Sequence, residues 1–176
     1  IGKNFKCDSI PSIYIVENSK LIISDNVYFR RNVEIRVHKN SIIQINRNIR
    51  IDRGTRLLST NNSKLHIGNN SKIGPYCIFN GGDNIFIGKD CLVSGFVYLQ
   101  TSSKIYKKGT PISHQGYRHG CITIGNDVWL GAHATILPDC KIGDGVIIGS
   151  NTVVKKSINP NEIHFGVPAK KIKERS

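Results

Sequence analysis

The sequence lacks methionine and contains only one tryptophan, three alanines and eight leucines among its 176 residues. Helices favour alanine and leucine, so this composition argues against a helical protein and against a coiled coil. No run approaches the roughly 18–20 apolar residues needed to cross a bilayer. No charged-then-apolar segment typical of a secretory signal opens the chain. We therefore expect a cytoplasmic protein, at most peripheral at the inner face of the membrane. Because the chain opens at Ile1 without methionine, we also expect that a few residues precede it.

The residues that are abundant favour strands and turns. The chain holds 28 isoleucines, 17 glycines and 17 asparagines, a combination that suits β-branched strands separated by tight turns. Its length allows one domain with a sizeable core, which we assign to residues 1–176. The 25 basic and 12 acidic side chains give a net charge of +13.

The five cysteines show no CxxC pairing and are odd in number. A disulfide framework or a zinc knuckle would need even, clustered spacing. We interpret the cysteines as small buried hydrophobes in a reducing compartment. Cys77, Cys91 and Cys140 occupy a repeated small-residue position of the pattern described next.

Six-residue repeats organise the sequence. Five consecutive hexads begin at Ile124, and each carries an aliphatic residue first, usually glycine second, and a small or β-branched residue fifth. They read IGNDVW, LGAHAT, ILPDCK, IGDGVI and IGSNTV. Weaker copies begin at Ile45, Ile51, Ile67, Ile73 and Ile87. Ten aligned copies are strong evidence for a repeat protein.

The spacing predicts a solenoid. An aliphatic side chain every six residues stacks on its counterparts only if each hexad forms one short strand and one turn. Three hexads then close a triangular coil of 18 residues, which is the distance from Ile124 to Ile142. Successive coils stack as parallel strands about 4.8 Å apart around an Ile/Val ladder. Between Ile23 and Ile87 the coils are 22, 22 and 20 residues long, and we expect their extra residues to bulge at corners.

These motifs resemble the hexapeptide-repeat acyltransferases, and within that family the sugar and polysaccharide O-acetyltransferases. The resemblance covers residues 20–172, and residues 124–154 and the tail FGVPAK match the family pattern closely. It implies an all-β, left-handed parallel β-helix (a hexapeptide-repeat solenoid), although crossover rules alone favour right-handed connections. It also implies a homotrimer with sites in the clefts between subunits. An exposed face flanked by aliphatic strands favours oligomerisation independently.

Two segments depart from the repeat. Ile87 and Ile124 lie 37 residues apart, and residues 100–121 between them are polar and basic without hexad register. We expect an extruded functional loop there, with a tolerated surface insertion as the alternative. In the resembled family a loop at this place reaches over a neighbouring subunit and helps to wall the active site. The chain closes with a predicted cap over residues 155–176, including a short capping helix over residues 169–175.

Acetyl transfer from a thioester to a sugar hydroxyl needs a general base. Members of the resembled family use a histidine on the leading edge of the loop, but here that stretch, residues 101–106, reads TSSKIY. His119 and His114 are the candidate catalytic residues, because histidine titrates near neutrality. The alternatives are an indirect role of Ser103 or Lys104, or a protein that no longer catalyses. We expect direct attack without an acyl-enzyme, because no cysteine or serine is paired with a neighbouring base.

The resemblance also implies where the donor substrate, acetyl-CoA, binds. Trp129 would line the binding site of the acetyl-pantetheine arm, or alternatively pack at a subunit interface. Small residues would let the CoA arm approach backbone amides, and lysines would suit its phosphates. The donor-binding residues so implied are Trp129, Gly131, Ala132, Gly149, Ser150, Lys155, Pro168 and Lys170.

The other histidines carry no metal-ligand spacing, and no metal is expected. A zinc hydratase on the same scaffold would need three convergent histidines. We interpret His38, His66 and His164 as ordinary strand or turn residues and His133 as a solvent-facing turn residue.

The sequence therefore predicts an acetyl-CoA-dependent O-acetyltransferase acting on a sugar of a bacterial surface or capsular polysaccharide or its precursor. One alternative is a catalytically silent β-helix that binds CoA or glycan or serves as a scaffold. Another is an N-acetyltransferase of a nucleotide-linked amino sugar. A nucleic-acid partner is disfavoured because basic residues are spread over all coils and aromatic residues make up only 7%. An anionic carbohydrate acceptor would use the same positive charge.

Overall fold

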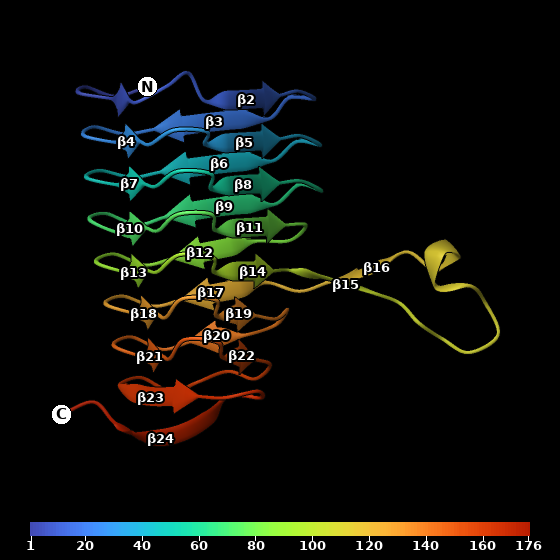
Figure 1. The fold of residues 1–176 in the computed structure, drawn as a ribbon. Helices are drawn as coiled ribbons and strands as arrows, with labels where there is room; N and C mark the ends of the chain where they lie inside the picture. The colour runs from blue at the N-terminus through green and yellow to red at the C-terminus, as the bar shows by residue number, and fades with distance from the viewer.

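Successive turns of the chain stack in register along one axis. The computed structural model describes residues 1–176, and Ile23, Ile45, Ile67 and Ile87 are direct neighbours on adjacent parallel strands. The ladder continues to Ile124 and beyond. The predicted left-handed parallel β-helix is confirmed, with about seven turns (Figure 1).

Three faces form the sides of the solenoid. The first face holds nine strands, β1 (Lys6–Cys7), β4 (Tyr28–Phe29), β7 (Arg50–Ile51), β10 (Lys72–Ile73), β13 (Leu92–Val93), β18 (Trp129–Leu130), β21 (Ile147–Ile148), β23 (Glu162–Phe165) and β24 (Lys170–Glu174). The second face holds seven, β2 (Ser12–Ile15), β5 (Glu34–Val37), β8 (Arg56–Ser59), β11 (Ile78–Gly81), β14 (Tyr98–Gln100), β19 (Thr135–Ile136) and β22 (Val153–Val154). The third face holds six, β3 (Lys20–Ile23), β6 (Ile42–Ile45), β9 (Lys64–Ile67), β12 (Ile85–Ile87), β17 (Ile122–Ile124) and β20 (Lys141–Ile142).

The chain passes from the first face to the second, from the second to the third, and back to the first, and we number the three corners in that order. Residues 52–55, 60–63 and 68–71 are examples of the first, second and third corners. The corners explain the asparagine content, because many of their residues have a left-handed φ near +57°, which asparagine tolerates. At the third corner, side-chain amides also bond from coil to coil, as in the 2.9 Å bond from Asn48 Nδ2 to Asn70 Oδ1.

The longer upstream coils do not bulge at their corners, so that expectation was wrong. In the 22-residue coil that starts at Arg50, the three strands have two, four and four residues. In the 18-residue coil that starts at Trp129, each strand has two. The four extra residues lengthen the strands of the second and third faces, so that each of these strands buries two side chains, such as Ile43 and Ile45, instead of one. Figure 1 shows the resulting narrowing of the coils toward the C-terminus.

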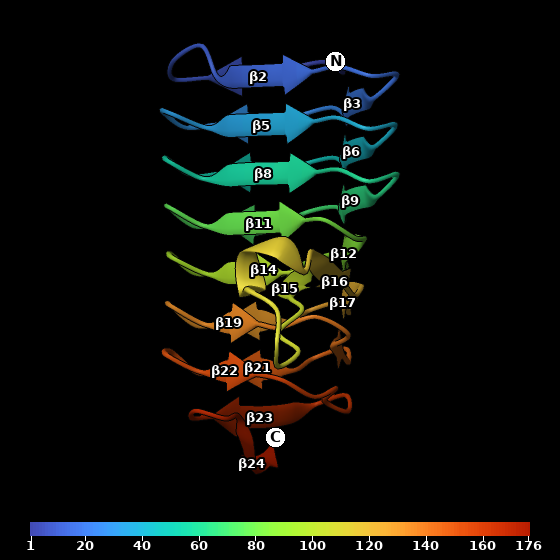
Figure 2. The ribbon, with the colours of Figure 1, turned by 90° about the vertical axis from the view of Figure 1, so that its right-hand side faces the viewer.

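The predicted loop leaves the solenoid at the second corner, where wide coils give way to narrow ones. Its base is an antiparallel hairpin of β15 (Ser102–Lys104) and β16 (Tyr117–His119), and its tip carries a 3-10 turn, η1 (Ile112–His114). The hairpin projects away from the coils in Figure 1 and points toward the viewer in Figure 2. The segment therefore has regular structure that the hexad analysis did not predict.

The predicted C-terminal capping helix is wrong, because residues 170–174 form strand β24. It pairs antiparallel with β23, the last parallel strand of the first face. A strand satisfies the open backbone groups at the end of a sheet, which a helix cannot do. An ion pair between Lys171 Nζ and Glu162 Oε1, 3.0 Å apart, adds to this pairing.

The core is a single cluster of 34 buried apolar side chains inside the three faces. Cys77, Cys91 and Cys140 belong to it, and burial raises the pKa of the Cys77 thiol to about 11. Cys7 is exposed, so the expectation of burial fails there. No helix of the structure has the length and apolar character needed to span a membrane.

Candidate functional site

A polar groove runs beside the base of the hairpin. It is a cavity of about 470 Å³ at the second corner and has mostly hydroxyl, amide and imidazole side chains. Its lining residues are His38, Lys39, Thr60, Asn61, Asn80, Gly82, Ser102, Tyr117 and His119. We call it the hairpin groove. Groups that donate and accept hydrogen bonds over so small an area suit a hydroxyl-rich ligand.

His119 is held in this groove by a serine on the opposite strand. Ser102 and His119 are direct partners in the hairpin register, and Ser102 Oγ lies 2.8 Å from His119 Nδ1. The pair leaves Nε2 of His119 without a protein partner. The expectation that no serine pairs with a base was therefore wrong, because the hairpin brings together residues that are 17 positions apart.

Gly82 makes room for this pair. A Cβ built on Gly82 would lie 2.2 Å from Ser102 Oγ and 2.9 Å from His119 Nδ1. No left-handed φ requires glycine at this position. The glycine is therefore needed for the close approach of the hairpin base to the coil above it.

His114 lies apart from His119. It ends the 3-10 turn at the tip of the loop, is exposed, and its side chain makes no hydrogen bond. The structure thus places only one of the two candidate bases beside the solenoid.

Trp129 lies in a second groove, on the first face, which we call the tryptophan groove. This cavity of about 340 Å³ is lined by Arg50, Asp52, Lys72, Ile73, Gly74, Leu92, Val93, Ser94 and Trp129. The indole Nε1 donates a hydrogen bond to Ser94 Oγ, 3.2 Å away, while half of the Trp129 surface stays exposed. The hydrogen bond fixes the ring across the C-terminal end of the groove.

The two grooves lie on opposite sides of one chain. The first face is opposite the second corner in a three-sided solenoid. In Figure 1, β18 lies at the left edge and the hairpin leaves at the right. His119 and Trp129 of the same chain therefore cannot act on one substrate together.

The four small residues implied to contact CoA meet at the first corner. Gly131 and Ala132 lie directly above Gly149 and Ser150, as the 2.7 Å bond from the Gly131 N–H to the Ile148 carbonyl shows. A Cβ on Gly131 would lie 2.5 Å from the Ser150 nitrogen, so glycine is also required there for stacking of the coils.

The remaining implied donor residues lie at the C-terminal end. Lys155 and Pro168 line a cavity of about 250 Å³ together with Lys156 and His164, and the exposed Lys170 begins β24 beside it. The cationic lining fits phosphate groups. His164 lies in strand β23, in agreement with its interpretation as a strand residue; it is buried and its Nε2 lies 2.9 Å from Glu162 Oε2.

A band of exposed apolar side chains follows the first corner beside the tryptophan groove. Tyr76, Phe96 and His133 stack with ring centroids 5.2 and 4.7 Å apart, and each has a left-handed φ. His133 is thus exposed, as expected, but packed in a ladder. Leu92 and Ile78 extend the band onto the adjoining faces. Such a contiguous patch marks an interaction surface.

Sequence reasoning missed Ser102, Gly82 and the cations of the tryptophan groove. The pair Gly81–Gly82 was a usable signal, because glycine within a strand marks close backbone approach. Lys72 and Arg50 gave no signal, since outward residues of different coils become neighbours only through the stacking register. The structure contains no group of three or more His, Cys, Asp or Glu side chains placed to hold a metal ion.

Comparisons with known proteins agree with this architecture. Residues 121–156 match the family model described as bacterial transferase hexapeptide (six repeats). Galactoside O-acetyltransferase of Escherichia coli (strain K12) is 32% identical over 127 residues, which cover 61% of this chain and 63% of that protein. The chain spans about three fifths of the length of the first curated relatives that it matches.

Two solved structures are also similar to this chain. The polySia-specific acetyltransferase NeuO superposes with a TM-score of 0.74 at 25% identity, covering 99% of this chain and 79% of that one. Galactoside acetyltransferase in complex with coenzyme A has a TM-score of 0.60 at 31% identity, covering 64% of this chain and 56% of that one. In residues 121–156 and in its solenoid architecture, the chain is therefore similar to hexapeptide-repeat acetyltransferases.

Proposed function

We propose that this protein transfers an acetyl group from acetyl-CoA to a hydroxyl of a sugar in a bacterial surface polysaccharide or its precursor. The observation that carries the proposal is the Ser102–His119 pair at the hairpin base. The resembled enzymes carry their histidine on the leading strand of the loop. Here the leading strand has Ser102, and the histidine stands directly across from it on the trailing strand.

His119 acts as the general base. With the Nδ1 proton donated to Ser102 Oγ, Nε2 is unprotonated and accepts the proton of the sugar hydroxyl. The hydroxyl oxygen attacks the thioester carbonyl carbon, the C–S bond breaks, and the proton leaves with the CoA thiolate. A base held by a second group gains from orientation, because small displacements of a catalytic group are costly.

The donor would run from the C-terminal end of the second corner to the first corner. The phosphates fit the cationic cavity around Lys155, Lys156 and Lys170, and the arm would pass Gly149 and Gly131 toward Trp129. Coenzyme A is bound in the structure of galactoside acetyltransferase, which supports a CoA donor for this chain.

A homotrimer would complete the site. Since His119 and Trp129 lie on opposite sides of one chain, the hairpin of one copy must reach the tryptophan groove of another. The exposed band along the first corner, which includes Tyr76, Phe96 and Leu92, would be covered in the same assembly. Large exposed apolar patches are otherwise an aggregation hazard.

Thermal unfolding with and without acetyl-CoA tests the proposal, with dephospho-CoA as the control for the phosphate contact. Acetyl-CoA at 100 times its Kd adds about 2.7 kcal/mol of stability, and dephospho-CoA adds less. A shift combined with a base-labile ester on the sugar supports O-acetylation, whereas a base-stable product indicates an amide. Absence of any shift contradicts the proposal and favours a silent scaffold.

A further inference from the structure

The tryptophan groove has two chemically different ends. Trp129 and Leu92 make its C-terminal end apolar, while Lys72, Arg50 and Asp52 make its N-terminal end charged. These residues stand on adjacent strands β18, β13, β10 and β7. At about 4.8 Å per strand, Lys72 lies about 10 Å and Arg50 about 14 Å along the axis from Trp129.

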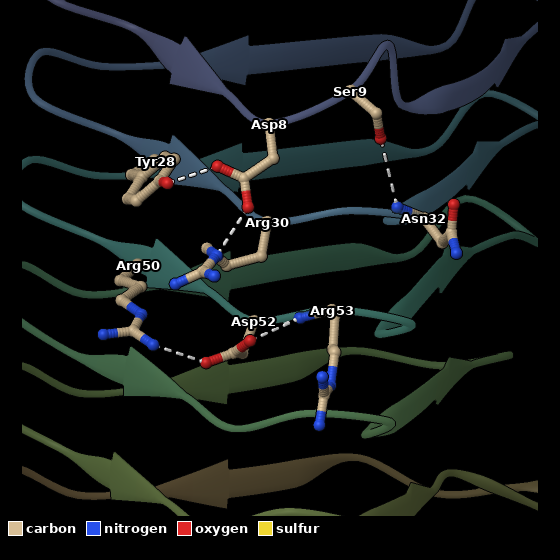
Figure 3. A network of polar contacts seen from close by, with 8 residues as sticks. All are labelled: Asp8, Ser9, Tyr28, Arg30, Asn32, Arg50, Asp52 and Arg53. Carbon is tan, nitrogen blue, oxygen red and sulfur yellow. Dashed lines mark hydrogen bonds and ion pairs between the residues drawn. The ribbon is translucent and has the colours of Figure 1, made fainter.

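Most of the charge at the N-terminal end is internally neutralised. Arg50 Nη2 lies 2.6 Å from Asp52 Oδ2, and the Arg53 N–H donates to Asp52 Oδ1 at 2.7 Å (Figure 3). Burial raises the pKa of Asp52, but these two hydrogen bonds outweigh it and lower the pKa overall. Asp52 is therefore ionised and balances Arg50.

Lys72 is the charge of the groove that remains uncompensated. It forms no ion pair in the structure, so Arg50, Asp52 and Lys72 together carry one net positive charge. One coil up, Arg30 is also neutralised, here by Asp8 of the preceding coil (Figure 3). An ammonium without a carboxylate partner, in a groove that also holds a tryptophan, is suited to a carboxylate from outside.

The surroundings raise the positive potential further. Seven of the nine arginines lie between residues 30 and 56, and four of these, Arg30, Arg36, Arg50 and Arg56, form ion pairs. The other three, Arg31, Arg47 and Arg53, form none and stand at the two corners that border the first face, on coils N-terminal to the loop. A field of one sign beside a groove attracts a ligand of the opposite sign.

We propose that the acceptor is an acidic sugar chain, whose carboxylate binds Lys72 while the ring that is acetylated lies against Trp129 and Ser94. This inference rests on the proposed function and names the substrate class for it. The donor arrives from the C-terminal side, which leaves the N-terminal half of the groove for the acceptor. The 10 Å between Lys72 and Trp129 matches separation of the bound acid from the reacting hydroxyl by neighbouring sugar units.

The inference is tested by comparing the affinities of charged and uncharged sugars for the protein with and without the Lys72 ammonium. The probes are a trisaccharide of N-acetylneuraminic acid and one of galacturonic acid, each as free acid and as methyl ester. Binding to the full chain is measured by calorimetry at low and high salt. The variants are Lys72→Gln and, as a matched control on the outer side of the third face, Lys141→Gln.

We expect at least one acid to bind about tenfold more tightly than its ester, which is the worth of one charge-assisted contact. Lys72→Gln removes this preference and leaves the ester affinity unchanged, while Lys141→Gln changes neither. High salt weakens binding of the acid and leaves binding of the ester unchanged.

Equal binding of acid and ester, no binding of either acid, or equal losses in both lysine variants would overturn the inference. The acetyl-CoA thermal shift of the same samples separates this failure from failure of the proposed function. A normal shift without acid preference leaves the acetyltransferase proposal standing and removes the acidic acceptor. If the shift is absent, the binding comparison alone decides whether an acidic-sugar site exists.

Discussion

Replacing Gly82 by alanine should displace the proposed base, His119, without changing that residue itself. The new methyl group would lie 2.2 Å from Ser102 Oγ, so the hydroxyl must rotate away and its hydrogen bond to His119 is lost. The bond itself is worth about 0.5–1.5 kcal/mol. Since the backbone at Gly82 suits alanine, we expect the melting temperature to change by less than about 4 °C.

The effect on catalysis is larger than the effect on stability. A base displaced by about 1 Å costs about 10²-fold in rate, so kcat should fall roughly 10- to 100-fold while the acetyl-CoA affinity stays unchanged. The assay is CoA release followed by a thiol reagent at saturating acceptor. Ser102→Ala should show a similar loss, and the double variant little more than either, because both act on one contact.

Ser103→Ala is the matched control, since Ser103 neighbours Ser102 on β15 but makes no side-chain hydrogen bond. An unchanged kcat in Gly82→Ala with an intact fold would refute the positioning of His119 by Ser102. An equal loss in Ser103→Ala would show that the hairpin as a whole was disturbed.

Three further outcomes follow from the geometry. His119→Asn should lower kcat by roughly 10²–10⁴-fold and His114→Asn should not, as measured by the same thiol assay; the opposite order would move the base to the loop tip. Ile45→Ala, at a fully buried rung, should cost about 2–5 kcal/mol in urea unfolding, whereas Ile22→Ala on the exposed side should cost much less; equal costs would contradict the core assignment. Hydrogen bonds from His164 and then Lys171 lower the pKa of Glu162 to about 2, so the stability that this contact gives above the ordinary pKa of 4.5 is lost as the pH falls toward 2. Glu162→Gln should therefore flatten that part of an acid-denaturation curve, and an unaltered curve would argue against the contact.

The solenoid was predictable because its determinants are local and repeated. An aliphatic residue at the start of each hexad specifies the ladder from Ile23 to Ile142, and an asparagine, aspartate or glycine at most corners specifies the turns. The C-terminal strand was not predictable, because it forms by pairing with the open edge of β23 and residues 170–174 show no local pattern that specifies a strand.

The site was predictable only in part. His119 and Trp129 were recognisable as chemically useful residues, yet their neighbours come from other coils. Ser102 contacts His119 only through the hairpin register, and Lys72 shares a groove with Trp129 only through two steps of strand stacking. Neither the hairpin register nor the stacking register can be read from the composition, so these arrangements could be found only in the structure.

The central claim is that His119 drives acetyl transfer from acetyl-CoA to a sugar hydroxyl. The most direct measurement follows radiolabelled acetyl-CoA with an acidic trisaccharide and compares wild-type protein with His119→Asn, after a thermal shift has confirmed that both bind acetyl-CoA. The account predicts a base-labile labelled product with wild-type protein and roughly 10²–10⁴-fold less with the variant. Equal product from both proteins would contradict the role of His119, and no product from any sugar tested despite acetyl-CoA binding would contradict the proposed reaction.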